Sequence, residues 1–154
     1  MDAMHENSRI LSCLGRVNVG VLATLEKKLG TMRQRVMYYG FDENFSCYLL
    51  SAKGSPKTNH ALASIDVSFM AFGLEDPYDK SWEVEIDGNS ELLTKAVDIS
   101  FALEKLKGRN PFADIAIESG ISAQFDLIRI NPTIVRYRVY GEILKGMPPT
   151  IVVF

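Results

Sequence analysis

Several β-forming runs follow one another directly in the first third of the chain, and this succession most constrains the fold. Turn-like segments at 26–30 and 42–44 separate the runs, and no segment between them is long enough for a crossover helix. Strands joined this way pair antiparallel, so we expect a meander of three consecutive strands. The three expected strands span residues 16–25, 31–40 and 45–51.

The rest of the chain continues this β-rich pattern and adds short helices. Trp82, Val84 and Ile86 alternate with acidic residues, which predicts a half-exposed strand with a solvated acidic face. Gly88-Asn89 predicts a bulge, Thr94 a helix cap and Asn131-Pro132 a turn between two strands. The remaining expected strands are 67–73, 82–93, 125–130 and 133–144, and the expected helices are 7–14, 56–64, 94–107 and 112–118. The fold class is therefore mainly β (α+β): a six- to seven-stranded antiparallel barrel with flanking short helices, closed because closure removes exposed edges.

The length and net charge of the chain limit its number of domains and the classes of partner that it can bind. The 154 residues are expected to form a single domain (1–154), and a net charge of −2 argues against a nucleic-acid or membrane partner. Cys13 and Cys47 lie in no metal-ligand spacing, so we expect reduced thiols and no metal. The polar first nine residues do not resemble a signal peptide, and a cytoplasmic location follows by elimination. The apolar tail after Pro148-Pro149 is expected to dock on the core or on a partner subunit.

Two arginines mark the segment that carries chemistry. Arg33 and Arg35 lie two apart on one expected strand, so both side chains leave the same face. Neighbouring guanidinium groups repel each other, which is tolerable if they are solvated or if an anion lies between them.

The loop after the third run supplies a possible anion site. Ser55 is a good helix N-cap and Pro56 fits the first helical position, which leaves the next backbone N–H groups open to a phosphate. Lys57 adds a charge, and Ser51 a hydroxyl. The alternative is an ordinary helix start beside a solvated strand face. A nucleoside-triphosphate P-loop is excluded, because Pro56 stands where that motif needs glycine.

In the order and spacing of its motifs, the sequence resembles the pyridoxamine 5′-phosphate oxidase-like, FMN-binding split β-barrels. The resemblance covers residues 16–144. Its elements are Val19-Gly20-Val21-Leu22-Ala23-Thr24-Leu25, Arg33-Gln34-Arg35-Val36-Met37, Ser51 with Ser55-Pro56-Lys57, and Phe125-Asp126-Leu127-Ile128-Arg129-Ile130-Asn131-Pro132.

The resemblance implies a homodimer with FMN at the subunit interface. Val36 and Met37 would lie along the flavin ring, and the strand with Trp82 and Glu83 would contribute across the interface. The residues implied for the phosphate and ribityl chain are Arg33, Arg35, Ser51, Ser55 and Lys57. The Arg- and His-containing substrate motif of the founding oxidase is absent near the C-terminus, which argues against that activity.

The expected function is an FMN-dependent oxidoreductase that acts on an unidentified small molecule, with a nicotinamide or dioxygen partner. Three alternatives stay open: a non-catalytic flavin-binding or stress-response protein, a haem- or deazaflavin-binding member of the same fold, and a flavin-free barrel. Trp82 is also readable as a packing residue. His5 and His60, the only histidines, give haem little support.

Overall fold

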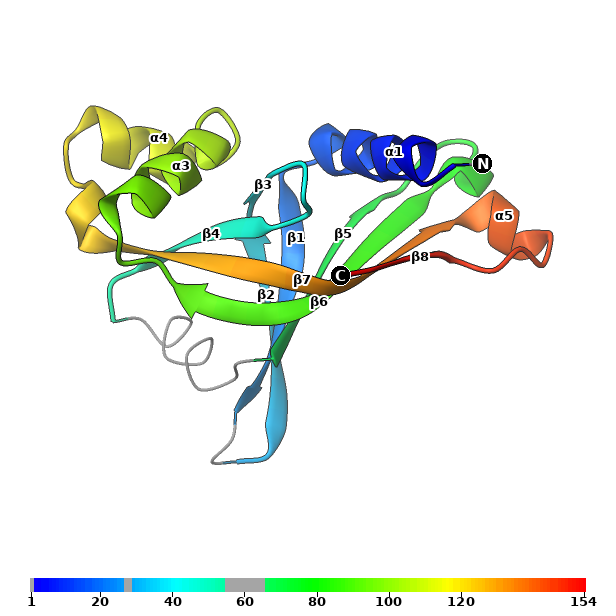
Figure 1. Ribbon diagram of the computed structural model, residues 1–154, viewed down its shortest axis with the longest axis horizontal. Coiled ribbons are helices and arrows are strands. Elements are labelled where there is room, and N and C mark those ends of the chain that lie inside the picture. Colours follow the sequence, from blue (N-terminus) through cyan, green and yellow to red (C-terminus); the bar gives the residue numbers. More distant parts are fainter. Residues whose placement is uncertain (1, 27–28, 55–65) are drawn as a thin grey trace.

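The chain folds into one curled antiparallel sheet with helices at its two ends (Figure 1). The computed structural model describes residues 2–26, 29–54 and 66–154. The expected helix 56–64, Ser55 and Lys57 lie outside this described part of the chain. The expected mainly β, antiparallel split-barrel fold is confirmed, but the sheet has eight strands in the described residues and is open at β2, so the expected closure is wrong.

The described part contributes eight strands to the sheet. Their order is β2-β1-β5-β6-β7-β4-β3, and β8 also pairs with β7. The strands are β1 (Val19–Glu26), β2 (Thr31–Tyr38), β3 (Gly40–Phe41), β4 (Cys47–Ala52), β5 (Asp66–Gly73), β6 (Trp82–Leu92), β7 (Phe125–Val139) and β8 (Thr150–Val153).

The expected three-strand meander is wrong in its pairing. β2 pairs with β1, but β4 pairs with β7, from Cys47 opposite Ile130 to Ala52 opposite Phe125. The burial of the two strands explains the difference. Five consecutive residues of β4 are buried and suit the inside of a sheet, whereas most of β2 is exposed and suits a terminal strand.

The expected turn at Asn131-Pro132 is also wrong, because β7 runs through it as one strand. The register shifts here: Gly88 lies opposite Pro132 and Asp87 opposite Ile134, which leaves Thr133 as an extra residue. A bulge of this kind accommodates a proline that cannot donate to the ladder. The bulge predicted at Gly88 is therefore confirmed, and it is what keeps β7 continuous.

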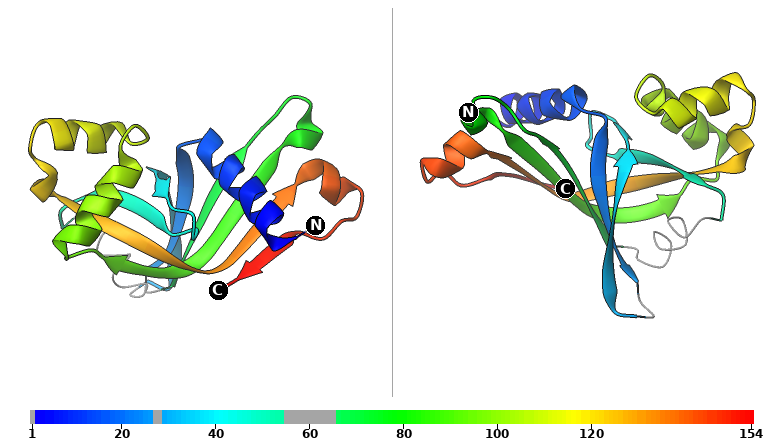
Figure 2. Two further views of the ribbon diagram at one scale, coloured as in Figure 1. Left: turned by 45° about the horizontal axis from the view of Figure 1, so that its top comes forward. Right: turned by 180° about the vertical axis from the view of Figure 1, so that it is seen from behind.

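Helices cover both ends of the sheet, as the two views of Figure 2 show. Helix α1 begins earlier than expected and buries Ile10 and Leu14, two residues of its expected apolar face. Thr94 does not cap α3; the N-cap is Lys95. The helical segments are α1 (Ala3–Arg16), η1 (Tyr78–Lys80), α3 (Ala96–Leu106), α4 (Pro111–Glu118), η2 (Ser122–Gln124) and α5 (Tyr140–Leu144).

Two apolar clusters form the core. The larger joins α1 to β1, β5, β6 and β7, and the smaller joins α3 and α4 to β4 and the start of β7. The apolar tail docks on the chain's own sheet: β8 pairs with β7, and the Phe154 ring packs at 5.9 Å from that of Phe45. Within the described residues, no helix has the length and apolar character needed to cross a membrane.

Candidate functional site

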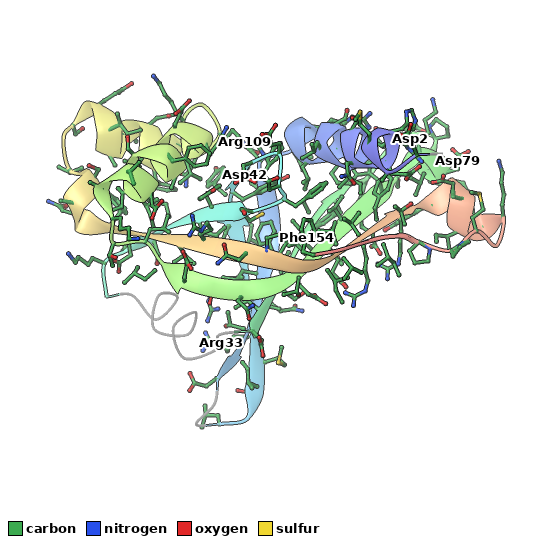
Figure 3. All side chains as sticks on the ribbon, viewed as in Figure 1. Asp2, Arg33, Asp42, Asp79, Arg109 and Phe154 are labelled. Carbon is green, nitrogen blue, oxygen red and sulfur yellow. The ribbon has the colours of Figure 1, made fainter. Side chains whose placement is uncertain are left out.

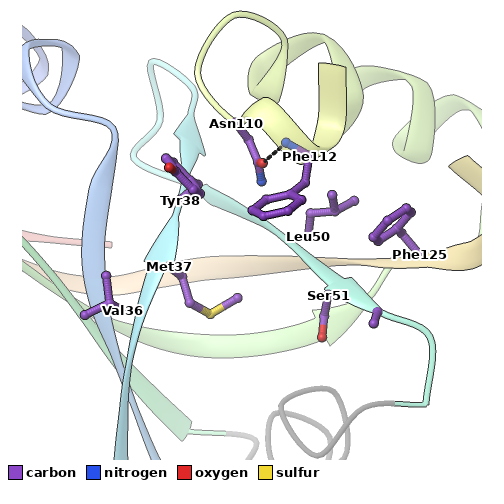
Figure 4. A pocket seen from close by; sticks show the side chains of 9 residues that line it. Val36, Met37, Tyr38, Leu50, Ser51, Asn110, Phe112 and Phe125 are labelled. Carbon is purple, nitrogen blue, oxygen red and sulfur yellow. Dashed lines mark hydrogen bonds between the residues drawn. The ribbon is translucent and has the colours of Figure 1, made fainter. Parts of the chain in front are cut away.

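A pocket of about 320 Å³ opens where the terminal strand β2 approaches β4 and the start of α4 (Figure 4). Strand β2 gives one wall, β4 and the first residue of β7 give a second, and the N-terminus of α4 gives a third. The lining residues are Val36, Met37, Tyr38, Leu50, Ser51, Ala52, Asn110, Phe112 and Phe125.

The backbone edge of β2 faces this pocket. The N–H of Tyr39 bonds the carbonyl oxygen of Asn18 on the β1 side, at 3.0 Å. Because backbone groups alternate in direction along an antiparallel strand, the N–H and C=O groups of Val36 and Tyr38 point to the other side. No strand of the described residues pairs with that side, since β2 ends the sheet. The pocket therefore combines apolar walls with a row of available backbone donors and acceptors.

The side chains are mostly apolar, with two polar groups among them. Met37 is 6% exposed and extends from β2 toward β4, where Ser51 is 3% exposed (Figure 4). The Asn110 carbonyl oxygen caps α4 by accepting from the N–H groups of Phe112 at 2.9 Å and Ala113 at 3.3 Å. No acceptor for the Asn110 amide nitrogen is found in the described part of the chain. A flat ligand with an apolar body and a polar rim matches this donor set.

The arginine pair lies on β2, toward the hairpin end from the pocket. Arg33 and Arg35 share one face of the strand, as predicted, opposite Thr24 and Leu22 of β1. Figure 3 places Arg33 on the projecting hairpin. Nη1 of Arg35 donates to Oγ1 of Thr24 at 2.7 Å. Partial burial and repulsion from Arg33 together lower the pKa of the Arg35 guanidinium. An anion close to both groups would relieve that repulsion.

The structure brings some of the predicted site residues together and leaves others apart. Val36, Met37 and Ser51 line one pocket. Trp82 does not join them: it is 1% exposed in the larger apolar cluster, where it bounds a separate pocket beneath α1. Its neighbour Glu83 lies on the opposite face of the sheet and forms an ion pair with Arg138 at 3.1 Å.

Six of the lining residues were not among the predicted site residues. Three of them neighbour predicted residues on β2 or β4, and the other three are distant in sequence from β2. Asn110 followed by Pro111 is a recognisable helix start, and this signal could have placed a capping residue there. Phe112 belongs to the first turn of the helix that Asn110 caps, so the same signal could have placed it near Asn110. Phe125 carries no such signal, because its position depends on the pairing of β7 with β4.

The acidic row on β6 is half-exposed, as expected, and is ion-paired. Nη1 of Arg136 lies 2.7 Å from Glu85 and 2.6 Å from Asp87. The row therefore holds strands β6 and β7 together across their outer face. Residues 2–26, 29–54 and 66–154 contain no cluster of three His, Cys, Asp or Glu side chains suited to a metal ion.

Similarity to known proteins is found at the level of structure. No protein-family model matches the sequence. No curated protein matches it either.

Solved structures do match. A haem-binding protein from Mycobacterium smegmatis superposes with a TM-score of 0.73 at 18% identity, over 99% of this chain and 59% of that one. A protein related to general stress protein 26, of the pyridoxine phosphate oxidase family, from Clostridium acetobutylicum gives a TM-score of 0.70 at 10% identity, over 100% and 97% of the two chains. An FAD-binding protein from Mesorhizobium loti gives 0.67 at 20% identity, over 89% and 94%.

These neighbours define the class of the fold. The chain has the split β-barrel architecture of pyridoxamine 5′-phosphate oxidase-like proteins, as its sequence motifs indicated. It spans less than two thirds of the length of the haem-binding protein that it matches. At these identities the likeness establishes the fold, and the function rests on the site.

Proposed function

We propose that this protein binds FMN in the pocket beside β2 and is an FMN-dependent oxidoreductase acting on a small molecule, with a nicotinamide or dioxygen partner. One observation carries the proposal: the edge of β2 with which no described strand pairs faces an apolar pocket, and a repelling arginine pair lies further along the same strand. FMN has a flat ring with a polar rim at one end and a phosphate at the other, which matches this order of groups.

Each part of the chain has a role in the proposed complex. Val36, Met37 and Tyr38 would hold the ring through backbone groups and apolar contacts, while Ser51 would bond the ribityl chain. Arg33 and Arg35 would bind the phosphate, and Ser55 and Lys57 remain predicted contacts outside the described residues. The bound flavin supplies hydride or single-electron transfer, and the protein positions it and excludes water.

The proposal includes a homodimer with the flavin at the subunit interface. Val36 and Phe112 border the pocket and are 70% and 60% exposed, an unusual state for apolar side chains next to a ligand site. A volume of about 320 Å³ is small for a ligand of three fused rings with a phosphorylated chain. A second copy that covers these side chains would deepen the pocket.

The fold neighbours support a flavin and also provide the main alternative. One neighbour binds FAD and another binds haem. Among the described residues that line the pocket there is no histidine, the commonest haem ligand, while His60 lies outside the described part of the chain.

The visible spectrum of the purified protein is the direct test. Absorbance bands near those of free oxidised flavin, with FMN released on denaturation, are expected. A haem or deazaflavin spectrum would contradict the proposal. A colourless protein with no thermal shift in added FMN would also contradict it and favour a flavin-free barrel.

Titration of apo-protein with FMN tests the residues. Arg35→Ala should weaken FMN binding about tenfold to a hundredfold, because a charge-assisted bond contributes about 1.5–3 kcal/mol. Lys57→Ala should act in the same direction, while Lys145→Ala, on the exposed end of α5, is the matched control. Unchanged affinity in both site variants would exclude this phosphate site.

Stopped-flow mixing of the FMN-loaded protein with NADH or NADPH addresses catalysis. Reduction of the flavin within seconds, followed by reoxidation in air, supports an oxidoreductase. If neither NADH nor NADPH reduces the flavin, a non-catalytic flavin-binding or stress-response role is favoured.

A further inference from the structure

A second pocket, of about 620 Å³, lies beneath α3 at the opposite side of Phe125 from the proposed flavin site. Of the residues that the structure describes, Phe125 alone lines both pockets. The second pocket is bounded by the end of β6, the start of β7, η2 and the loop after β4. Its lining residues are Lys53, Leu92, Leu93, Thr94, Ala96, Ile99, Ser100, Leu103, Ser122, Ala123, Phe125, Asp126 and Leu127.

Aliphatic and aromatic side chains form the walls of this pocket. Ile99 and Leu103 of α3 lie on one side, and Leu93 and Leu127 lie on the other, continuous with the smaller apolar cluster. The volume falls in the range typical of pockets for small organic molecules. A ligand with an apolar body of one or two rings, or a medium-length alkyl chain, would fill it.

Among the described residues of the lining, Lys53 is the one cation. The backbone N–H of Lys53 donates to the carbonyl oxygen of Gln124 at 3.1 Å, which fixes this lysine beside η2. No ion pair of the Lys53 ammonium is found within the described ranges. Oδ2 of Asp126, the one carboxylate among the described lining residues, accepts from the N–H of Gly54 at 3.2 Å, so one of its oxygens is engaged.

We propose that this pocket beneath α3 binds a small amphipathic anion, with its apolar body against Ile99 and Leu103 and its anionic group at Lys53. Lys53 supplies the attraction for the charge, and the hydroxyls of Thr94, Ser100 and Ser122 supply further hydrogen bonds. An aromatic or medium-chain carboxylate or sulfonate has this chemistry. The site is separate from the proposed flavin pocket and does not depend on it.

Fluorescence titration of the apo-protein with 8-anilinonaphthalene-1-sulfonate tests the proposal, because this dye has an apolar two-part body and one anionic group. One dye per chain is expected. Ser100→Trp should weaken binding at least tenfold by filling the pocket. Lys53→Gln should weaken it about threefold to tenfold, as expected for a partly solvated charge contact.

Two exposed positions provide matched controls. Val97→Trp places the same side chain on α3 outside the pocket, where Val97 is 72% exposed, and Lys107→Gln removes a charge at the far end of α3. Both controls should keep the dye affinity within about twofold of the unmodified protein. Lys53→Gln changes an exposed side chain, so it tests the site even if Ser100→Trp does not fold.

Three results would overturn the proposal: no dye binding, equal loss in variants and controls, or displacement of the dye by saturating FMN. The last result would place the dye in the flavin pocket. Dye binding that responds to Lys53→Gln in a protein with no FMN affinity would refute the flavin proposal and leave this one intact.

Discussion

The guanidinium group of Arg109 lies over the ring of Tyr39, 4.9 Å from its centroid, and its Nε donates to the backbone oxygen of the same residue at 3.1 Å. Its Nη2 donates to the carbonyl oxygens of Leu14 at 3.2 Å and Val17 at 2.7 Å. One side chain between α3 and α4 thereby satisfies carbonyls at the end of α1 and just after β2. It fixes the loop that presents Asn110 to the proposed flavin pocket.

Replacing Arg109 with lysine should lower the free energy of unfolding by about 2–3 kcal/mol. Lysine keeps the charge but cannot make the same forked set of bonds or the same stacking. Urea unfolding followed by circular dichroism measures the effect, with Lys107→Gln as the control on the same segment. A loss no larger than that of the control would show that these bonds contribute little.

Asn110 caps α4, and we expect its amide nitrogen to donate to the bound flavin. Asn110→Ala should cost about 1 kcal/mol, the usual contribution of an N-cap, whereas Asn110→Ser should keep the cap. Both variants lose the amide donor, so both should weaken FMN binding. If Asn110→Ser retains stability and full FMN affinity, the amide nitrogen has no part in binding.

Gly88 and Gly15 should respond in opposite ways to alanine. A Cβ on Gly88 would collide with the backbone carbonyl of Asn131, so Gly88→Ala should disrupt the bulge and lower the melting temperature markedly. On α1, a Cβ at Gly15 would meet only the Phe41 ring, at an ordinary 3.8 Å. Gly15→Ala should therefore be neutral or stabilising by up to about 1 kcal/mol. Equal effects of the two substitutions in thermal unfolding would contradict the close packing at the bulge.

Stability should fall at alkaline pH, and Cys47 should contribute first. Burial, reinforced by Asp42, raises the pKa of the Cys47 thiol to about 12. In the unfolded chain the thiol titrates near ~8.5, so the unfolded state loses its proton while the native state keeps it. The contribution is complete below pH ~8.5 and is lost as the pH rises toward 12.

Urea midpoints between pH 8 and 10 measure this loss. The midpoint of Cys47→Ala should start lower, because of the cavity, but change less with pH than that of the unmodified protein. Burial also raises the pKa values of Tyr39, Tyr48 and Tyr137, whose contributions are lost at higher pH. Equal pH slopes in the two proteins would mean that Cys47 ionises without unfolding.

Local patterns predicted most strands and helices, but not which strands pair. The strand expected over 133–144 ends at Val139 and is followed by helix α5, and β8 was not predicted. The alternation around Val84 and the bulge at Gly88 depend on neighbours in sequence, and both are confirmed. The meander failed because β4 pairs with β7, about eighty residues away. The turn predicted at Asn131-Pro132 is wrong, because a bulge opposite Gly88 lets β7 continue through these residues.

The residues of the candidate site likewise divide into those that are close in sequence and those that only tertiary pairing brings together. Val36, Met37 and Ser51 belong to motifs close together in sequence, and the structure places them around one pocket. Asn110 and Phe125 come from segments that only tertiary pairing brings there. Trp82 was implicated by the family resemblance, as part of a strand that contributes across the subunit interface. Its 1% exposure in the core agrees with its other reading, as a packing residue.

The two apolar clusters meet at the candidate site. Met37 belongs to the larger cluster and Leu50 to the smaller, and both line the same pocket. A ligand bound in this pocket would therefore contact both clusters. Its binding should slow amide hydrogen exchange in β2 and β4, two strands whose residues line the pocket.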